Sequence, residues 1–406
     1  MTANINSDTI KVMSETIVIA GAGFGGVRVA LDLSRKLPHQ RICLINNSPN
    51  HCYTPDLYEV ASAKIKATAS AKLHQTVSIP LNQIFHASNV EVFIEEIQSI
   101  DLIAKKLQTN KQQFEYDYLV LGLGSVTNFF GVEGASQYSH PLKNSEEAVN
   151  IRNSLVELSR AKPNLNVVVA GGGFSGVELA GEMNHFLPKQ AKVTLIEAMD
   201  NILTGMPEWC QKQAAARLQK LGVAVMTKHP IEKISEKELI CGGEKVEFDY
   251  LIWTAGIKGN NLDQKIKGVE FTKRGQLSVT SNLNLSDHPQ VYALGDLAEV
   301  IDQKTQKSVP PTAWAAIGEG AIVAKNIIAT LNKTSPQSYI APYPSFVVPV
   351  GGKYAMTNAL GLEMSGIIIW MIKQMISMRY FLTILPISGA ISVWWNGVST
   401  FISNDA

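Results

Sequence analysis

The sequence predicts an α/β protein that contains two related βαβ units and ends in an apolar segment. Residues 16–20 read TIVIA, a run typical of a buried strand, and they lead directly into the turn GAGFGG. Residues 166–170 read NVVVA and lead into GGGFSG in the same way. Residues 366–402 are strongly apolar.

Each unit continues beyond its glycine turn. In the first, the apolar spacing of residues 27–37 (VRVALDLSRKL) is helical, and a strand is expected at 41–45. In the second, a helix at 177–187 precedes a strand, KVTLIE, that ends at Glu197. A strand, a glycine-rich turn, a helix and a second strand in this order are typical of a Rossmann unit. The sequence therefore predicts two Rossmann-like dinucleotide-binding domains.

Three further strands are expected. Residues 116–125 (YDYLVLGLGS) and 248–257 (FDYLIWTAGI) each predict a strand that ends in a glycine turn and either returns the chain to the first unit or closes the second. Residues 290–296 (QVYALGD) predict a strand that places Asp296 at its carboxyl end, where ligands of open α/β sheets bind. Asp296 is also interpreted as the N-cap of a helix formed by the following LAEV, and the two interpretations are compatible.

Length and composition limit the possibilities. A chain of 406 residues is long enough for two α/β domains and a tail, and we expect a polar N-terminal extension at 1–15. The first dinucleotide-binding domain is expected at 16–140 and 270–340, the second at 141–269, and a C-terminal region at 341–406. The net charge of +1 gives no electrostatic footprint for nucleic acid, so no such partner is expected. The four cysteines form no CxxC pair, so neither a metal site nor a redox-active disulfide is predicted.

The two glycine turns are expected to bind pyrophosphates. Backbone N–H groups at a helix N-terminus bind such an anion, and glycine removes the Cβ that would block its approach. The alternative is that these turns are purely structural. It is disfavoured because there are two such turns, and each is followed by a strand end about 20 residues downstream. Glu197 is placed to accept hydrogen bonds from an adenosine ribose and to repel a 2′-phosphate, so NADH is favoured over NADPH. At the first turn the corresponding residue is Asn46, whose amide can still bind a ribose.

Several segments together resemble the type II NADH:quinone oxidoreductases, single-subunit NADH dehydrogenases that do not pump protons. They are GAGFGG, NHCYTPDLYEVASA (50–63), YDYLVLGLGS, GGGFSGVELAGE (171–182), VYALGDLAEV (291–300) and PPTAWAAIGEG (310–320). The resemblance implies a flavoprotein with two dinucleotide-binding domains, which holds FAD in the first and NADH in the second.

The resemblance also implies the residues of each site. FAD binding is expected at Gly21, Gly23, Phe24, Gly25, Gly26, Asn46, Thr54, Gly124, Asp296 and Ala313. NADH binding is expected at Gly171, Gly173, Phe174, Ser175, Gly176, Glu178, Glu197 and Gly256. Glu178 is similar to a family glutamate near the nicotinamide and the flavin, where it couples substrate binding to proton delivery, so it is the expected catalytic residue. The alternative for Glu178 is a solvated residue in the first turn of a helix.

The expected quinone pocket departs from the family pattern. Starting from the alanine of Pro-Thr-Ala, the family usually reads AQxAxQ, and its two glutamines line the pocket. This chain has Trp314 and Gly318 at those positions, with Ile317 beside Gly318. An indole stacks on a quinone or flavin ring, but it has no amide for a quinone carbonyl. A structural role for Trp314 beside the flavin is the alternative, and a different quinone or a different acceptor stays open.

The C-terminal segment is expected to attach peripherally to the cytoplasmic face of the cell membrane. Four residues interrupt its apolar run, so no transmembrane span is predicted: Lys373, Arg379, Pro386 and Gly389. Aromatic side chains suited to headgroup depth are Trp370, Tyr380, Trp394 and Trp395. Lys373 and Arg379 are expected to face anionic lipid. A core helix or a homodimer face is the alternative.

The expected reaction passes hydride from NADH to FAD and then two electrons to a membrane quinone. A sulfide:quinone oxidoreductase is the nearest rival, but it needs cysteines flanking the flavin, and Cys43, Cys52, Cys210 and Cys241 are not obviously placed for this. The missing CxxC disfavours a disulfide reductase. A soluble ferredoxin-type reductase would have no use for the apolar tail. Outside enzymes, the alternative is an NADH-binding redox-sensing flavoprotein.

Overall fold

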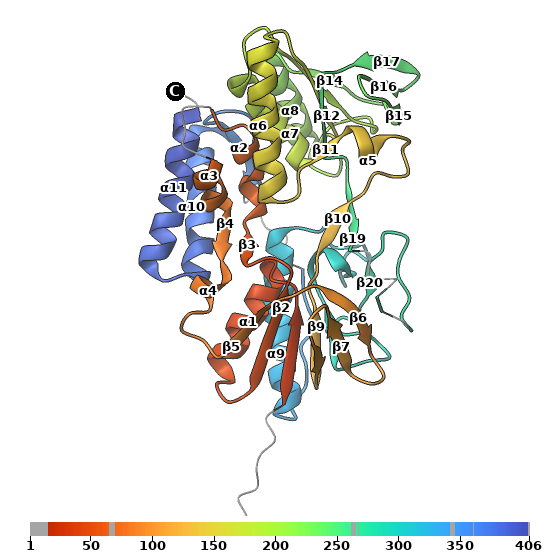
Figure 1. The fold of residues 1–406 in the computed structure, drawn as a ribbon, viewed down its shortest axis with the longest axis vertical. Coiled ribbons are helices and arrows are strands. Elements are labelled where there is room, and N and C mark those ends of the chain that lie inside the picture. Colours follow the sequence, from red (N-terminus) through yellow and green to blue (C-terminus); the bar gives the residue numbers. More distant parts are fainter. Residues whose placement is uncertain are drawn as a thin grey trace, which may run out of the picture. The chain divides into compact units, whose positions relative to one another are not determined.

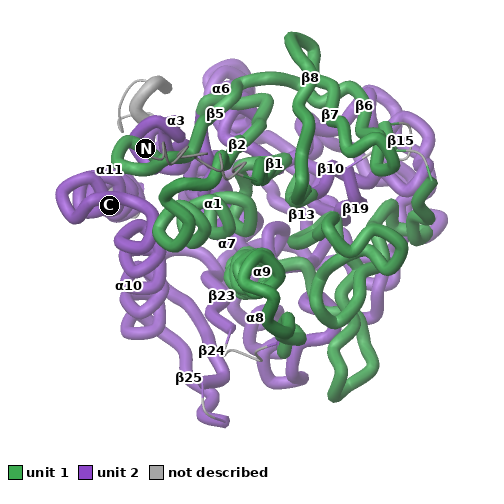
Figure 2. Tube along the Cα trace, turned by 90° about the horizontal axis from the view of Figure 1, so that it is seen from below, with its two compact units in different colours: residues 1–49, 85–124, 261–340 green, residues 50–84, 125–260, 341–406 purple. Residues whose placement is uncertain are grey.

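The computed structural model describes residues 15–64, 70–260, 265–266, 268–341, 346–359 and 361–404. The chain forms two compact units (Figure 2). Unit 1 contains residues 1–49, 85–124 and 261–340, and unit 2 contains residues 50–84, 125–260 and 341–406. Residues 1–14, most of the expected N-terminal extension, lie outside the described residues.

Unit 1 is organised around a parallel sheet in the order β21–β9–β1–β2–β5 (Figure 1). Its strands are β1 (Thr16–Ala20), β2 (Arg41–Asn46), β5 (Val90–Ile94), β9 (Tyr118–Leu121) and β21 (Val291–Ala293). The apolar residues of β1 are fully buried, as is usual for a parallel strand covered on both faces. Helix α1 (Phe24–Lys36) packs on β1 and β2 and against α9 (Ala313–Leu331).

Smaller elements complete unit 1. They are the antiparallel sheet β6 (Ile97–Asp101), β7 (Lys106–Thr109) and β8 (Gln113–Glu115), the pair β20 (Leu277–Ser278) and β22 (Ala298–Glu299), and the 3-10 turn η2 (Gly295–Leu297). Because η2 is followed directly by the strand β22, the helix expected over LAEV does not form. The interpretation of Asp296 as its N-cap is therefore wrong.

Unit 2 repeats the arrangement with a parallel sheet in the order β11–β18–β12–β13–β14. Its strands are β11 (His140–Pro141), β12 (Asn166–Ala170), β13 (Lys192–Ile196), β14 (Ala224–Met226) and β18 (Tyr250–Trp253). Helix α7 (Phe174–Phe186) packs on β12 and β13. The strand β12 lies between β13 and β18 as β1 lies between β2 and β9, so the two predicted βαβ units are confirmed. The strands expected within 116–125 and 248–257 are confirmed as the neighbours of β1 and β12.

The remaining elements of unit 2 surround this sheet. The helical elements are η1 (Thr54–Asp56), α2 (Leu57–Ala61), α3 (Ser70–Val77), α4 (Leu81–Ile84), α5 (Ala135–Tyr138), α6 (Ser145–Ala161) and α8 (Glu208–Lys220). The strands are β3 (Asn50–Cys52), β4 (Ser78–Pro80), β10 (Ser125–Thr127), β15 (Ile231–Ile234), β16 (Glu238–Cys241), β17 (Glu244–Glu247) and β19 (Ile257–Gly259).

The C-terminal part of unit 2 is an antiparallel sheet followed by two helices that pack against each other (Figure 1). The elements are β23 (Val347–Pro349), β24 (Ala355–Ala359), β25 (Leu362–Gly366), α10 (Ile367–Ile384) and α11 (Ile387–Asn404). Pro386 disfavours a helical conformation at Leu385, which is extended and ends α10. Gly389 lies inside α11 and does not interrupt it. Among the described helices, α9 and α10 are long and apolar enough to cross a membrane, by length and composition alone.

The compact units do not follow the expected domain boundaries throughout. Residues 50–84, for example, belong to unit 2 by their contacts, whereas the sequence placed them in the first domain. Compactness does not define where a ligand binds, so the boundaries of the two binding domains stay a prediction.

Candidate functional site

The first glycine turn joins β1 to α1. Gly21 has a φ of +101°, which glycine adopts readily, and a Cβ there would lie 2.4 Å from the Gly122 carbonyl oxygen. A Cβ on Gly26 would lie 1.9 Å from the Gly21 carbonyl oxygen. Helix α1 can therefore start close to the end of β1 only with glycine at these positions.

The second glycine turn has the same geometry in unit 2. Gly171 has a φ of +103°, and a Cβ on Gly176 would lie 1.8 Å from the Gly171 carbonyl oxygen. The first and third glycines of the two motifs therefore serve the same purpose, which is close packing of the helix against the strand.

The middle glycines, Gly23 and Gly173, have a different role. A Cβ on Gly173 would meet no atom within 4 Å, and the nearest atom to a Cβ on Gly23 would be 3.9 Å away. Packing therefore does not require glycine at either position. Each precedes a helix whose N-terminus no side chain caps among the described residues. The open space and the N–H groups of the first helical turn fit a pyrophosphate in both units.

The strand ends beside the turns hold Asn46 and Glu197. In unit 1 the Asn46 Oδ1 accepts a hydrogen bond from the Ala22 N–H at 3.0 Å, and its Nδ2 donates to the Ser48 carbonyl at 2.7 Å. In unit 2 the two oxygens of Glu197 accept from the Gly172 N–H at 2.6 Å and the Met199 N–H at 2.8 Å. Both side chains therefore lie directly at their turns, where the adenosine ribose of a bound dinucleotide is expected.

The other residues expected at the FAD site divide between the units. In unit 1, Asp296 is half-buried in η2, and the Gly295 N–H of that turn donates to the Glu319 carboxylate at 2.6 Å. Burial raises the pKa of Glu319 to about 7. Sequence reasoning missed Glu319, which holds this turn, because nothing in the sequence distinguishes it from an ordinary helical residue.

The remaining FAD residues differ in exposure, and Gly25 is buried against Leu294. Gly124 has a φ of +68° at the end of the β9 loop, and Ala313 begins α9. Phe24 and Gly25 begin α1. Thr54 is exposed and belongs to η1 in unit 2. Their contacts with FAD stay a prediction.

In unit 2, the first turn of α7 presents Phe174 and Ser175, which are both exposed. Gly256 follows β18, and a Cβ there would lie 2.7 Å from the Phe130 ring. The expected NADH residues therefore come from the ends of β12, β13 and β18 and the start of α7. This is the carboxyl end of the sheet, where ligands of such folds bind.

Glu178 is the fifth residue of α7, and no acidic residue lies in the first turn of that helix, so the first-turn alternative is wrong. Its side chain is half-buried. Desolvation raises the pKa of Glu178 to about 8; Lys373 lowers it, whereas Asp56 and Glu182 raise it further. Glu178 therefore keeps its proton at neutral pH, which suits a group that delivers one.

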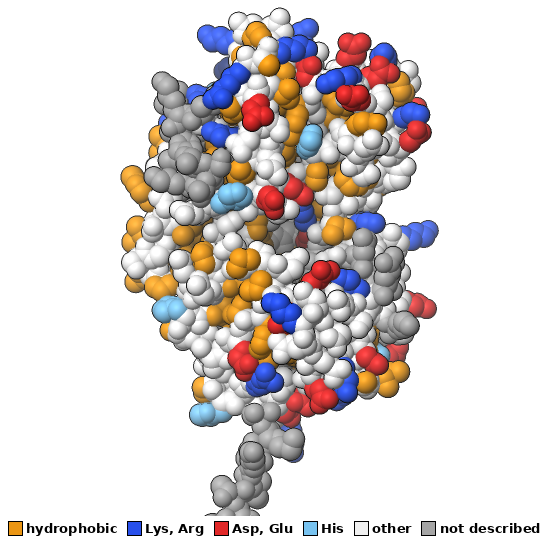
Figure 3. All heavy atoms as spheres, in the orientation of Figure 1, with side chains coloured by type: hydrophobic (Ala, Val, Ile, Leu, Met, Phe, Trp, Pro, Cys, Tyr) orange, Lys and Arg blue, Asp and Glu red, His pale blue; other side chains and the backbone are white. Residues whose placement is uncertain are grey.

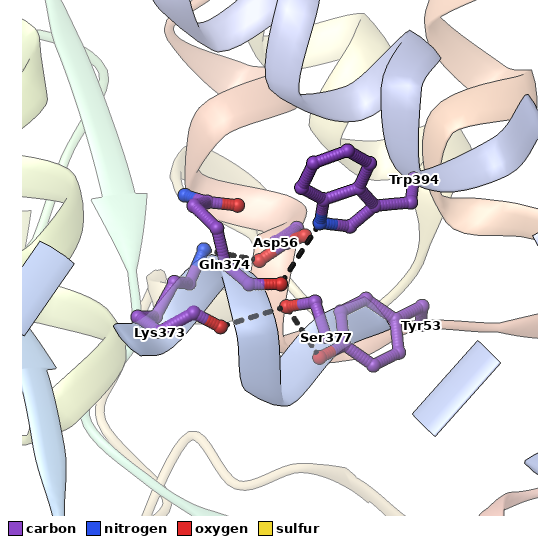
Figure 4. Close-up of polar contacts among 6 residues, drawn as sticks. All are labelled: Tyr53, Asp56, Lys373, Gln374, Ser377 and Trp394. Atoms are coloured by element: carbon purple, nitrogen blue, oxygen red, sulfur yellow. Dashed lines mark hydrogen bonds and ion pairs between the residues drawn. The ribbon is translucent and has the colours of Figure 1, made fainter. Parts of the chain in front are cut away.

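Lys373 was expected to face anionic lipid, and the structure contradicts this. Its side chain is buried in unit 2, and its ammonium group forms an ion pair with the buried Asp56 (Figure 4). Trp370 is also buried, and the Trp394 indole N–H donates to the Gln374 carbonyl at 2.9 Å. Trp395 and Arg379 are exposed as expected. Ion pairing explains the difference, because a lysine in an apolar helix can satisfy its charge inside the protein as well as at a membrane.

Sequence reasoning missed Asp56 and Glu182 beside Glu178. Glu182 is buried, and its Oε1 accepts a hydrogen bond from the Gly352 N–H at 2.9 Å. A lysine isolated in an apolar helix signals a buried ion pair, since such a charge is expensive without a partner. The sequence does not say which carboxylate supplies that partner.

The residues of the expected quinone pocket lie on α9 in unit 1. Thr312 caps this helix, with its Oγ1 accepting from the Ala315 N–H, and Trp314 is exposed in the first turn. One turn later, a Cβ on Gly318 would lie 3.4 Å from the Tyr339 ring. This is an ordinary van der Waals separation, so packing against Tyr339 does not require glycine at position 318. Ile317 is half-buried beside it.

Comparisons with known proteins agree with this geometry. Residues 15–320 match the family model described as pyridine nucleotide-disulphide oxidoreductase. A type II NADH:quinone oxidoreductase of Staphylococcus aureus is 27% identical over 348 residues, which cover 80% of this chain and 84% of that protein.

Solved structures have the same fold. NDH2 from Plasmodium falciparum in complex with NADH matches with a TM-score of 0.84 at 17% identity, covering 97% of this chain and 99% of that one. The sulfide:quinone oxidoreductase from Aquifex aeolicus matches with a TM-score of 0.76 at 20% identity, covering 96% and 93%. The α/β fold class with two dinucleotide-binding units is confirmed, and so is the resemblance to type II NADH:quinone oxidoreductases.

Proposed function

Because the chain belongs to the pyridine nucleotide-disulphide oxidoreductase family, we propose that it is an FAD-dependent NADH:quinone oxidoreductase attached to a membrane surface. The duplicated phosphate turn is the observation that carries this proposal. Two equivalent turns with open middle glycines provide for two dinucleotides in one chain. Bound FAD supplies two-electron chemistry that links NADH to the quinone.

Unit 1 is the proposed FAD-binding unit. The N-terminus of α1 would hold the pyrophosphate, with Gly23 leaving space for it. Asn46 would bind the adenosine ribose, and Asp296 at the end of β21 would lie toward the ribityl chain and the pyrophosphate.

Unit 2 is the proposed NADH-binding unit. Glu197 would accept hydrogen bonds from the ribose hydroxyl groups through lone pairs that its two backbone contacts leave available. The carboxylate would repel a 2′-phosphate, which supports NADH over NADPH. Glu178 would hold a proton near the nicotinamide and release it during turnover.

The cysteines support quinone rather than sulfur chemistry. Burial raises the pKa of Cys43, Cys52 and Cys210 to about 11, and the pKa of the buried Cys241 is also raised. Thiols with such pKa values stay protonated at neutral pH, whereas attack on sulfur requires a thiolate. A sulfide:quinone oxidoreductase or a disulfide reductase is therefore disfavoured by the chemistry of these residues.

The exposed apolar side chains of α10 and α11 support membrane attachment. Hydrophobic side chains gather over these helices at the left of Figure 3. The exposed members are Ile367, Ile368, Met371, Ile372, Met375, Ile376, Leu382, Ile387, Ile391, Trp395 and Ile402. The inward face of α10 is instead partly polar, so its apolar surface points outward. We propose that a lipid bilayer covers it, on the cytoplasmic face of the cell membrane; a second copy of the chain is the competing occupant.

The first test mixes the purified FAD-loaded protein with NADH without oxygen. Rapid loss of the oxidised flavin absorbance is expected, and it should return when a quinone is added. Slow formation of a charge-transfer band without turnover would instead favour a redox sensor. A protein that contains no flavin and takes none up would exclude the proposal.

The second test screens electron acceptors with NADH as the donor. Quinones are expected to support turnover, and ferredoxins are not. Trp314→Gln, which restores an amide on the first turn of α9, is expected to change the KM for quinone but not for NADH. If the wild type and Trp314→Gln have the same KM for each quinone, Trp314 does not contribute to the acceptor site.

A further inference from the structure

Phe130 lies in a turn of unit 2 and has a backbone conformation that its side chain disfavours. The turn runs from Phe129 to Val132, whose N–H donates to the Phe129 carbonyl at 2.9 Å. Its two central residues, Phe130 and Gly131, have φ values of +52° and +72°. Turns with two positive φ values favour asparagine and glycine, and a bulky side chain is strained there. The turn alone therefore does not explain phenylalanine at position 130.

Burial does not explain Phe130 either. Phe130 is 63% exposed, whereas its neighbour Phe129 is partly buried and packs against the apolar core of unit 2. Residues held in strained backbone conformations concentrate at ligand-binding sites. The surroundings of the Phe130 ring therefore indicate what it does.

Hydrogen bonds to the segment around the end of β18 hold the start of this turn. The Asn128 N–H donates to the Gly256 carbonyl at 3.0 Å, and the Trp253 indole N–H donates to the Asn128 carbonyl at 2.9 Å. The Asn128 Oδ1 in turn accepts from the Phe130 N–H at 2.9 Å. The backbone of Phe130 is therefore fixed relative to Gly256, although its side chain is exposed.

The Phe130 ring lies against Gly256. A Cβ at Gly256 would be 2.7 Å from the Phe130 Cζ, so the ring takes the space that a side chain at position 256 would need. Gly256 follows β18, which lies on the opposite side of β12 from β13.

This position corresponds to one end of the proposed NADH site. Adenosine would lie at Glu197, directly after β13, and the pyrophosphate at the glycine turn after β12. A dinucleotide extended across the carboxyl ends of these strands would bring its nicotinamide to the end of β18, beside Gly256 and Phe130.

We propose that the exposed face of Phe130 packs against the nicotinamide ring and orients it. The inference deepens the proposed function and rests on NADH binding in unit 2. Two aromatic rings attract each other in offset or edge-on contact at centroid separations of about 4.5–7 Å, so no hydrogen bond to the ring is required. Phe130 would then favour ligands that contain nicotinamide over those that contain only the rest of the dinucleotide.

The test compares two ligands in the full-length, FAD-loaded protein with its flavin oxidised. NAD⁺ contains nicotinamide and does not reduce oxidised flavin, whereas ADP-ribose has both riboses and the pyrophosphate but no nicotinamide. Titration calorimetry gives both Kd values. Phe130→Asn should weaken NAD⁺ binding about fivefold and leave the Kd of ADP-ribose unchanged, because only the ring contact is lost. Its Tm should equal or exceed the wild-type value, since asparagine suits the turn.

Two further variants serve as controls. Phe130→Tyr keeps an aromatic ring and should keep the wild-type ratio of the two Kd values. Gln306→Asn is the matched control, because Gln306 is exposed and uncharged, lies in unit 1 and has a φ of +54°. It should change neither Kd. If Phe130→Asn does not fold, Phe130→Leu, which has an apolar side chain without a ring, decides by the same ratio.

A ratio of Kd values in Phe130→Asn within about twofold of the wild-type ratio overturns the inference. An equal loss of affinity for both ligands has this outcome too, since it indicates general damage to the site. If neither ligand binds the wild type, NADH binding in unit 2 is refuted, and the inference fails with it. Normal binding of both ligands to the wild type with an unchanged ratio in the variant refutes the inference alone.

Discussion

Asn46 and Glu197 occupy the same place in two copies of one turn, yet one is an amide and the other a carboxylate. The neighbouring loop explains the difference. In unit 1 the loop places the Ser48 carbonyl beside Asn46, whereas in unit 2 it places the Met199 N–H beside Glu197. An amide can donate to a carbonyl, but a carboxylate cannot.

Asn46→Asp is therefore expected to destabilise unit 1. The variant loses the hydrogen bond to Ser48 and places a charged oxygen against its carbonyl, which should lower the free energy of unfolding by about 1–2 kcal/mol. Chemical denaturation of the wild type and the variant measures this. An unchanged midpoint of unfolding would show that the contact with Ser48 contributes nothing.

Glu197→Gln tests cofactor choice at the second strand end. The variant keeps the shape of the side chain and removes the negative charge, so NADPH should bind about tenfold or more tighter relative to NADH than in the wild type. Titration of both nucleotides gives the ratio of Kd values. Equal ratios in the two proteins would mean that Glu197 does not select against the 2′-phosphate.

Because the pKa of Glu178 is raised to about 8, the direction in which pH changes the stability of the protein can be predicted. Between its unfolded value and about 8 the folded protein holds a proton that the unfolded chain has lost, so stability falls as pH rises through this window. Flavin reduction by NADH should likewise change near pH 8, as the proton leaves. Glu178→Gln should lose the pH dependence of stability, measured by thermal melts, and the pH dependence of flavin reduction, measured by stopped-flow kinetics. If either pH dependence persists in this variant, another group causes it.

At the scale of elements, different glycines of each strand–turn–helix connection serve helix packing and ligand binding. Gly173→Ala adds a Cβ that meets no protein atom, whereas Gly176→Ala forces a shift against Gly171. We expect Gly173→Ala to keep the wild-type Tm but to weaken NADH binding about tenfold, ~1.4 kcal/mol, because the Cβ takes the space of the pyrophosphate. Gly176→Ala should lower both the Tm and the affinity for NADH.

The test of this pair is thermal melting together with NADH titration. FAD content should stay unchanged in both variants, since the change lies in unit 2. Tight NADH binding by Gly173→Ala would contradict the assignment of the open space above this turn to a pyrophosphate.

At the scale of the whole molecule, the outer face of α10 and α11 is the proposed membrane-binding surface. Met375→Glu places a charge at the centre of the exposed apolar face without touching Lys373 or Asp56. It should reduce sedimentation with lipid vesicles severalfold and leave reduction of a water-soluble quinone intact. Ile103→Glu, at a residue of unit 1 that is 91% exposed, is the matched control and should have no effect.

A different result would identify the other occupant of this face. If Met375→Glu converts a dimer to a monomer in solution and vesicle binding does not change, the face binds a second copy of the chain.

The sequence by itself determined the two βαβ units, because β-branched runs, glycine spacing and helical periodicity act through neighbouring residues. It also placed Asn46 at the end of β2 and Glu197 directly after β13, each beside its own turn, and their contacts with a dinucleotide stay a prediction. The tertiary structure alone decided the environment of Lys373, which pairs with a residue 317 positions away, and that of Gly318, whose neighbour Tyr339 comes from beyond the helix. Local patterns carry no information on which distant charge or ring fills a space, and only the folded chain brings these groups within contact distance.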